Sequence, residues 1–566
     1  MVHPTTTPGW RIERDSMGEV AVPVSALYGA QTARAVSNIP ISALRLPSSL
    51  IKALAQVKQA AALTNAQLGV LDTDVANAIV NASAKIAAIS DGDASAQQDR
   101  PKDAVETQAT PLGVANSADP LFELSADPLF HLSGGWDQQF PIGTYQTGSG
   151  TSTNMNMNEV LATLASRELG KPVHPNDQVN ASQSTNDVFP TAIHVATASE
   201  LEQELLPALH ELFIALATKA HEFMRVVKAG RTHLQDATPV TLGQEFSGYA
   251  TSISHSIVRI TEQLEQVCEV ALGGTAVGTG LNTPSGYPQV VVDKLAEITG
   301  LPIRETHNHF EAQSTQDSLV SLSGMLKTLA VSLTKICNDL RWMASGPTTG
   351  LAEIHLPDLQ PGSSIMPGKV NPVVPEAVLM VCSRVVGNDA TVTWAGASGN
   401  FELNVQLPII ATTILESIHL LADACTVLAE KCVEGITANV EQAARYAQSS
   451  PAIVTALNPI IGYDKAAQIA KYAVEHQLTI KQAAIELGFV ADGLLTEDQL
   501  DDALDPILMT GPRYGGHSTP GQTDGSDADP SSPGLNNFGY ESDADLPVFD
   551  TTDDAVAKAL RNYRPE

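Results

Sequence analysis

Apolar side chains recur at alternating intervals of three and four residues through the middle of the chain. The longest such run consists of Leu319, Leu322, Leu326, Leu329, Leu333, Ile336 and Leu340. Residues 253–267 and 201–216 carry similar runs. This spacing places one apolar seam along each helix and favours packing at shallow crossing angles. Patterns with a period of two are short and scarce, so we expect a mainly α protein with a central bundle of very long helices.

Two regions interrupt this pattern. Residues 91–136 are rich in Asp, Gln, Pro and Ser and contain a tandem octapeptide, SADPLFEL followed by SADPLFHL. Residues 511–566 are also poor in periodic apolar positions. Proline interrupts helices, and such polar segments have too little apolar surface to form a core of their own. We expect both regions to be solvated insertions rather than domains, with short docking motifs in the repeat as the alternative.

Charge and composition narrow the choice of partners and compartment. The 566 residues include 32 Lys and Arg against 63 Asp and Glu, for a formal net charge of −31. This charge repels nucleic acid and anionic membranes, and we find no uninterrupted apolar run of ~18 residues and no signal peptide. The five cysteines are odd in number, lack C-x-x-C spacing and resemble small buried apolar residues. We therefore expect a cytoplasmic protein that binds neither nucleic acid nor membranes.

Two polar stretches in the first half of the chain could bind an anion. TGSGTSTNMNMNEV (Thr147–Val160) groups hydroxyls and amides around two glycines before a helical run. HPNDQVNASQSTNDVFPTAIH (His174–His194) offers Ser184, Thr185 and Asn186 before another helix. Small residues and helix N-termini expose backbone N–H groups to anions. A capped loop and a turn followed by a helix cap explain the same two stretches without a ligand.

Two later stretches carry candidate proton-transfer groups. GRTHLQDATPVTLGQEF contains His233, whose ordinary pKa lies near neutrality, although a structural histidine beside a turn is the simpler explanation. PGSSIMPGKVNPVVPEA (Pro361–Ala377) combines Ser363, Ser364, Lys369 and Asn371 in a loop with glycines and prolines. This density of functional groups favours a catalytic lid over an exposed linker.

Metal and nucleotide chemistry find little support in the sequence. It has no H-E-x-x-H motif, no paired Cys/His spacing and no EF-hand loop. The glycine-rich GGTAVGTGLN from Gly273 lacks the G-K-[ST] ending of a phosphate-binding loop and follows no clear strand. We therefore expect no metal and no cofactor.

In this order, the four stretches closely resemble the fumarase/aspartase superfamily, whose most specific motif is the loop GSSIMPGKVNP. The resemblance extends from about Arg11 to about Asp505, apart from residues 91–136. Within the superfamily the chain is similar to the class II fumarate hydratases. The resemblance implies a three-part lyase fold, a tetrameric helical core and active sites that each use three subunits. It also implies the tricarboxylic acid cycle reaction between fumarate and (S)-malate.

The same resemblance assigns roles to individual residues. Ser363 matches the general base, His233 the proton-handling histidine and Glu376 its charge partner, while Lys369 and Asn371 match the groups that meet the aci-carboxylate. The positions that match substrate-binding residues are Ser149, Gly150, Thr151, Ser184, Thr185, Asn186, Thr232, Ser364 and Asn371. The positions that match a secondary anion site are His174, Pro175, Asn176 and Asp177. We expect a serine base to need nearby N–H groups that stabilise its oxyanion.

Aspartate ammonia-lyase is the main alternative within the superfamily. His233, the glycine of MPGK and the segment SGNFELNV from Ser398 resemble fumarases. Thr185 and VVPEAV after Asn371 resemble aspartases instead. A lens-crystallin-like scaffold without activity is a second alternative, but it predicts damage at Ser363, Lys369, Asn371 or His233, and all four are intact.

The resemblance also sets expected domain boundaries. We predict an N-terminal domain over residues 1–146, with the insertion at 91–136, and a central long-helix bundle over 147–445. A small helical domain over 446–510 and an acidic, disordered tail over 511–566 complete the prediction.

Overall fold

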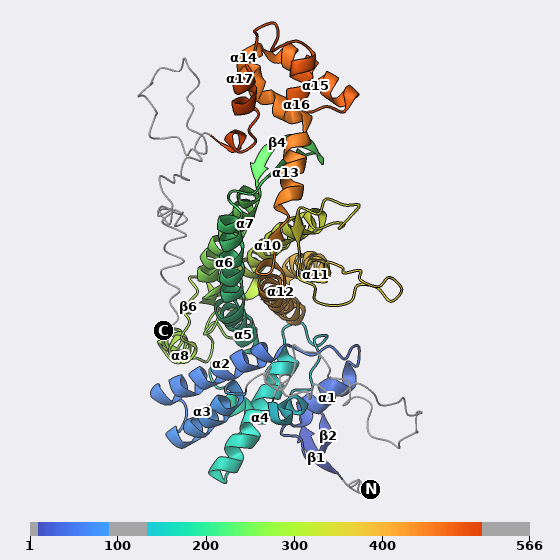
Figure 1. The fold of residues 1–566 in the computed structure, drawn as a ribbon. Coiled ribbons are helices and arrows are strands. Elements are labelled where there is room, and N and C mark those ends of the chain that lie inside the picture. Colours follow the sequence, from blue (N-terminus) through green and yellow to red (C-terminus); the bar gives the residue numbers. More distant parts are fainter. Residues whose placement is uncertain (1–8, 90–132, 512–566) are drawn as a thin grey trace. The chain divides into compact units, whose positions relative to one another are not determined.

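The computed structural model describes residues 9–89 and 133–511, and these residues form a mainly helical fold (Figure 1). They divide into two compact units, each of which draws on several segments. The first comprises Met1–Pro207, Arg259–Thr328 and Ser383–Ala422. The second comprises Ala208–Val258, Leu329–Cys382 and Asp423–Glu566. The octapeptide repeat and nearly all of the predicted tail lie outside the described residues, whereas residues 133–136 begin a short 3₁₀ helix.

The first unit packs short helices around α2. Its hairpin strands are β1 (Trp10–Asp15) and β2 (Gly18–Pro23), followed by α1 (Ala30–Asn38), α2 (Ser48–Gln67), α3 (Thr73–Ala87), η2 (Ser133–Gln139), α4 (Thr151–Leu169), η3 (Pro175–Val179), α5 (Thr185–Glu200) and η4 (Leu201–Leu205). Its later elements are β5 (Glu269–Val270), α8 (Tyr287–Thr299), β6 (Arg304–Glu305), α9 (His309–Ser314), β8 (Gly399–Asn400) and β9 (Leu403–Asn404). Helix α2 contacts α3, α5 and α8 most extensively. Alanine-rich α2 allows this close packing because its side chains are short.

The second unit combines a hairpin, a two-stranded bridge and a cluster of short helices. It contains nearly all of α6 (Leu206–Glu222), then β3 (Val227–Thr232), β4 (Gln235–Thr241), β7 (Ile354–His355), β10 (Thr437–Ala438) and α13 (Val440–Ser449). Its last elements are η6 (Pro451–Leu457), α14 (Asn458–Ile461), α15 (Tyr463–His476), α16 (Ile480–Glu486), α17 (Glu497–Ala503) and η7 (Leu508–Thr510). Strand β3 pairs antiparallel with β4, and β7 pairs antiparallel with β10.

Four long helices have residues in both units. They are α7 (Leu242–Val267), α10 (Asp317–Met343), α11 (Val373–Gly396) and α12 (Leu407–Leu428), the last continued by η5 (Ala429–Val433). Every residue of the predicted seam from Leu319 to Leu340 is at most 1% exposed. The seams at 253–267 and 201–216 are buried as well. The predicted mainly α fold with very long helices is therefore confirmed.

Two of these helices are apolar on average over long stretches, although neither contains an uninterrupted apolar run of ~18 residues. Asp317–Met343 and Leu407–Val433 are long and apolar enough to cross a membrane by length and composition. In the second, 72% of the most apolar window is buried inside the fold. Helix α10 also carries Lys327 and Lys335 in ion pairs with aspartates. The mostly buried second helix is explained as a core helix. In α10, 44% of the window is buried, and polar residues separate the apolar ones of the buried seam.

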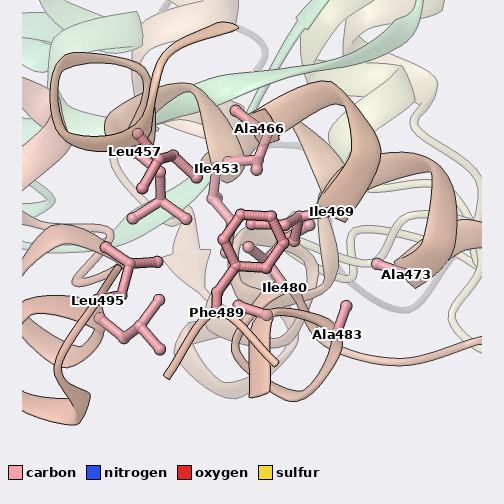
Figure 2. Packing of buried hydrophobic residues seen from close by; sticks show 13 residues of the cluster. Ile453, Leu457, Ala466, Ile469, Ala473, Ile480, Ala483, Phe489 and Leu495 are labelled. Atoms are coloured by element: carbon pink, nitrogen blue, oxygen red, sulfur yellow. The ribbon is translucent and has the colours of Figure 1, made fainter. Parts of the chain in front are cut away.

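The C-terminal helices have an apolar core of their own, which Figure 2 shows from close by. Ile453 and Leu457 of η6 lie against Ile469 of α15, and Phe489 completes the cluster. All thirteen buried members lie between residues 453 and 500. This local core supports the predicted small domain over 446–510, whose boundaries stay a prediction.

All five cysteines are free and buried, as the sequence suggested. Burial raises the pKa of Cys268 and of Cys432 to about 12. Because the thiolate is the reactive form, these thiols are poor nucleophiles at neutral pH. They serve as small apolar side chains in the packing.

Candidate active site

A pocket of about 570 Å³ lies in the first unit where α4 and α5 begin. Four predicted substrate-binding residues line it, namely Thr151, Ser184, Thr185 and Asn186, together with Asn176 from the predicted secondary anion site. Helix N-termini present unpaired N–H groups and a partial positive charge. The pocket is therefore suited to a small anion.

The start of α4 depends on two glycines. A Cβ at Gly148 would lie 1.7 Å from the carbonyl oxygen of Val405. At Gly150, where φ is +81°, a Cβ would lie 2.4 Å from the ring of Phe189. Close packing of the backbone brings Ser149 and Thr151 together, with their hydroxyl oxygens 2.9 Å apart. Other residue types would push this turn away from its neighbours.

The start of α5 is a capping box built on Asp187. The Ser184 hydroxyl accepts a hydrogen bond from the Asn186 amide, and the Ser184 amide donates to Asp187 Oδ1 at 2.9 Å. The other oxygen of Asp187 accepts from the amides of Gly273 and Thr275, both at 3.0 Å. Burial raises the pKa of Asp187, whereas these hydrogen bonds oppose the rise. The fully buried carboxyl group thus joins two chain segments at the pocket.

Neighbouring amides fix the remaining pocket side chains. Asn154 Nδ2 donates to Thr185 Oγ1 at 2.9 Å, and Asn186 Nδ2 donates to the Ala276 carbonyl at 2.8 Å. Thr275, Ala276 and Asn282 line the same pocket. The glycine-rich stretch from Gly273, which resembled a nucleotide loop only superficially, therefore belongs to this site. This stretch was not among the predicted site residues, although its glycines and hydroxyls are typical of an anion-binding loop.

The predicted secondary anion site borders a separate pocket of about 590 Å³ in the same unit. His174, Pro175 and Asn176 line it, and Asn176 also lines the first pocket. Its other lining residues include the guanidinium side chains of Arg11, Arg14 and Arg167 and the carboxylates of Glu13, Asp15 and Glu159. Asp177 sits at the start of η3, where its amide donates to His174 Nδ1. The pocket therefore holds three guanidinium and three carboxylate groups, none of which the sequence patterns assigned to this region.

In the second unit, His233 lies at a strained turn between β3 and β4. Thr232 pairs with Gln235, and the two residues between them, His233 and Leu234, have φ values of +55° and +60°. This left-handed conformation is unfavourable for most residues other than glycine, but asparagine, aspartate and histidine adopt it more readily, so the strain is greatest at Leu234. Such strain gathers at functional sites. The turn presents His233 and Thr232 as exposed side chains.

A buried charge network anchors this turn. Arg231 makes a bidentate ion pair with Glu353, whose side chain is 1% exposed, at 3.0 and 2.9 Å. Lys228 Nζ lies 3.3 Å from Glu353 and 2.7 Å from Glu245. At Gly230 a Cβ would meet the Thr238 carbonyl oxygen at 2.4 Å. The buried pairs hold β3 firmly, so the strain falls on the exposed turn.

The loop around Ser363 closes on itself within the second unit. The Gly362 amide donates to the Lys369 carbonyl at 2.7 Å, and Asn371 Nδ2 donates to the Gly362 carbonyl at 2.8 Å. A Cβ at Gly362 would lie 2.6 Å from the Lys369 carbonyl oxygen, so the closure requires glycine. The Ser363 hydroxyl accepts hydrogen bonds from the amides of Ile365 at 3.2 Å and Met366 at 3.0 Å. Two N–H groups in this position can stabilise an oxyanion at the hydroxyl.

The other predicted groups of this unit are exposed. Ser364 and the Lys369 side chain lie on the open face of the loop, and Glu376 lies in the first turn of α11. No ion pair joins His233 to Glu376 among the residues that the structure describes. Within residues 9–89 and 133–511, no group of three His, Cys, Asp or Glu side chains could hold a metal ion. The structure thus brings the loop residues together and leaves His233 and Glu376 on separate elements.

Comparisons with known proteins first give the class. Residues 130–387 match the family model described as Lyase, and residues 453–511 match the model described as Fumarase C C-terminus. A class II fumarase structure from Schistosoma mansoni has a TM-score of 0.78 at 36% identity, and covers 89% of this chain and 99% of its own. A structure titled fumarate lyase:delta crystallin from Brucella melitensis has a TM-score of 0.77 at 42% identity, over 89% of this chain and all of its own. These matches define a lyase fold.

Curated relatives then give the family. A protein of Mycobacterium tuberculosis named fumarate hydratase class II is 50% identical over 501 residues, which cover 88% of this chain and 96% of the relative. A protein of the same name from Ralstonia nicotianae is 47% identical, with 88% and 99% covered. The chain belongs to the class II fumarate hydratase family.

Proposed function

We propose that this chain catalyses the reversible anti addition of water to fumarate, giving (S)-malate, as a step of the tricarboxylic acid cycle. The observation that carries the proposal is the Ser363 hydroxyl, which accepts two backbone hydrogen bonds inside a loop closed by Gly362, Lys369 and Asn371. The names of the relatives from Mycobacterium tuberculosis and Ralstonia nicotianae, and their identity to this chain, support the same reaction.

In the direction of dehydration, the ionised hydroxyl of Ser363 takes the proton from C3 of malate. The electrons of that bond move toward the adjacent carboxylate and give the aci-carboxylate, whose charge Lys369 and Asn371 stabilise. The hydroxyl group on C2 then leaves as water with a proton delivered through His233, whose charge partner is Glu376. The amides of Ile365 and Met366 lower the cost of ionising Ser363 by donating to its oxygen.

The substrate-binding set in this proposal is the first unit's Ser149, Gly150, Thr151, Ser184, Thr185 and Asn186, with Thr232, Ser364 and Asn371. Neutral donors and two helix N-termini suit a dicarboxylate. The secondary anion site at His174, Pro175, Asn176 and Asp177 is part of the same proposal.

We further propose a cytoplasmic homotetramer with active sites shared between subunits. Apolar side chains of α11 are exposed in the single chain, with Met380 at 68%, Val386 at 44% and Trp394 at 77%. A long helix with such a face buries it against another subunit at little cost. Sedimentation should give about four times the chain mass of 59.6 kDa. A monomeric mass with full activity would contradict the shared sites.

The reaction is tested by following fumarate absorbance with purified protein. Fumarate should be consumed in water alone and should form from (S)-malate. The alternative, aspartate ammonia-lyase, predicts that fumarate and ammonia yield aspartate while malate is inert. Aspartate formation without malate would overturn the proposal.

A further inference from the structure

Helix α2 carries a lysine in the interior of the first unit. The Lys58 side chain is fully buried, and its ammonium donates to Asn180 Oδ1 at 2.9 Å and to Gln183 Oε1 at 3.0 Å. Both acceptors are neutral amide oxygens. None of the ion pairs found among the described residues includes Lys58. A buried cation that makes no ion pair lowers the stability of the folded chain, so its presence needs an explanation.

The charged surroundings of Lys58 are sparse. Desolvation lowers the pKa of Lys58 to about 7, and Asp187 on α5 opposes this fall through its negative charge. The buried phenol of Tyr287 on α8 lies in the field of the same Asp187. Helix α4 contributes the amides of Asn154 and Asn158 to the cluster. Among the described residues, no charged group of α3 or α4 acts on the ammonium.

Asn180 connects this ammonium to the pocket. Its Oδ1 accepts from Lys58 Nζ and also from the side-chain amides of Asn154 and Asn158, each at 3.2 Å. Asn154, Asn180 and Gln183 all line the pocket that Ser184, Thr185 and Asn186 border. Lys58 therefore lies one layer of amides behind the pocket wall. The groups that the ammonium contacts directly are neutral buried amides, so its charge is poorly screened toward the pocket, and Asp187 is the charged group that acts against it.

We propose that Lys58 is a positioning residue whose buried ammonium gives this pocket the positive potential that binds a substrate carboxylate. It acts through Asn180 and Gln183, which it holds in place, and it does not touch the substrate. The inference rests on the proposed function, since that function makes the ligand a dicarboxylate. An unpaired buried charge is then explained, because the incoming anion becomes its partner.

A structural tie is the competing explanation. Lys58 fastens Asn180 and Gln183, and Gln183 Nε2 in turn donates to the carbonyls of Val179 and Ala181. If fastening this turn were its whole role, removal of the ammonium would lower stability and leave anion affinity unchanged. Affinity and its pH dependence therefore separate the two roles.

The experiment compares Lys58→Met, Lys58→Arg and Lys85→Met with the full-length wild type. Lys85 is an exposed lysine of α3 in the same unit, so its loss removes the same charge from the surface. Calorimetric titration with succinate, a dicarboxylate that cannot be hydrated, measures binding without turnover. Fumarate kinetics give KM and kcat, and sedimentation and circular dichroism verify assembly and folding.

We expect Lys58→Met to raise the succinate Kd and the fumarate KM by roughly tenfold to a hundredfold, with kcat changed less. Lys85→Met should match the wild type. In the wild type the Kd should begin to rise above about pH 7, as the ammonium loses its proton. Lys58→Arg should stay tight at that pH, because a guanidinium keeps its proton.

A folded Lys58→Met variant with Kd and KM within about twofold of the wild type would overturn the inference. If that variant does not fold, a wild-type Kd that stays flat from about pH 6 to about pH 8.5 would overturn it equally. Succinate binding that depends on Lys58 in a protein unable to hydrate fumarate would support this inference and contradict the proposed function. Fumarate hydration with the same KM in Lys58→Met and in the wild type would support the proposed function and contradict this inference.

Discussion

The pocket of the first unit and the Ser363 loop of the second present their functional groups in opposite ways. The pocket is built on buried groups, with Asp187 fully enclosed and Asn154 locked to Thr185. The loop is exposed from Ser364 to Val370 and is held at its base by the contacts of Gly362. Binding of an anion benefits from donors fixed in advance, whereas a proton-transfer group on a loop can close over its substrate. We infer that the two tasks are divided between a rigid region and an adaptable one.

The largest effect is expected for Ser363→Ala, which tests whether the loop carries the proton-transfer group. Turnover should fall by more than ~10²-fold because the base is lost, while the free energy of unfolding should change by less than about 0.5 kcal/mol. Steady-state kinetics and urea unfolding measure the two effects. Ser449→Ala, at an exposed serine at the end of α13, is the control and should alter neither. Near-normal hydration by Ser363→Ala would refute the base assignment.

The pocket should respond to Asp187→Ala mainly through stability. Three backbone amides would lose their acceptor in a buried place, so the unfolding free energy should fall by about 3 kcal/mol. Urea unfolding of the purified variant measures the loss. Asp293→Ala, at an exposed carboxylate of α8, should change stability by about 0.5 kcal/mol or less. A loss below about 1 kcal/mol for Asp187→Ala would contradict the view that the buried hydrogen bonds of Asp187 hold the pocket rigid.

Lys58 should make the free energy of unfolding depend on pH. Its pKa is about 7 in the folded chain and about 10.4 when unfolded, so between these values the unfolded chain holds more of this proton. Below about pH 7 the buried ammonium lowers the free energy of unfolding to its full extent, and this loss disappears as the pH rises and the group loses its proton. Wild-type stability should therefore increase relative to Lys58→Met, by up to about 1.4 kcal/mol per pH unit. Parallel unfolding profiles at about pH 7 and about pH 9 would contradict this sign.

The smallest effect is expected at the strained turn of the second unit. Leu234 is 67% exposed and has φ at +60°, so Leu234→Gly should relieve strain and raise stability by about 0.5 kcal/mol. Leu359→Gly is the matched control, because Leu359 is 46% exposed without a positive φ. That control should lower stability, since glycine adds freedom to the unfolded chain. Equal losses in both variants would argue against strain at the turn.

Much of the fold and the closure of the Ser363 loop could be predicted because the signal is local. The three–four spacing from Leu319 to Leu340 reports a helix and its buried side directly. The loop from Gly362 to Asn371 closes through its own backbone, so its residues stay together in sequence and in space. Ser184 and Asp187 form a capping box within four residues, so this contact is also local in the sequence.

Other site features escaped prediction because distant segments create them. Thr275 and Ala276 reach the pocket from about ninety residues beyond Asn186, through contacts that no local pattern records. Lys58 sits in an alanine-rich helix where nothing nearby in sequence distinguishes it from the partly exposed Lys52. Its burial arises from the packing of α2 on α3, α5 and α8.

The long helices, the turns that need glycine and the chemical groups of the loops can be predicted from the amino-acid sequence alone. These depend on side-chain spacing and backbone conformation, which neighbouring residues control. The tertiary structure decided which groups share a pocket, which carboxylate and ammonium become buried, and how their pKa values move. Those properties depend on desolvation and on distances between segments remote in the chain, and folding alone sets both.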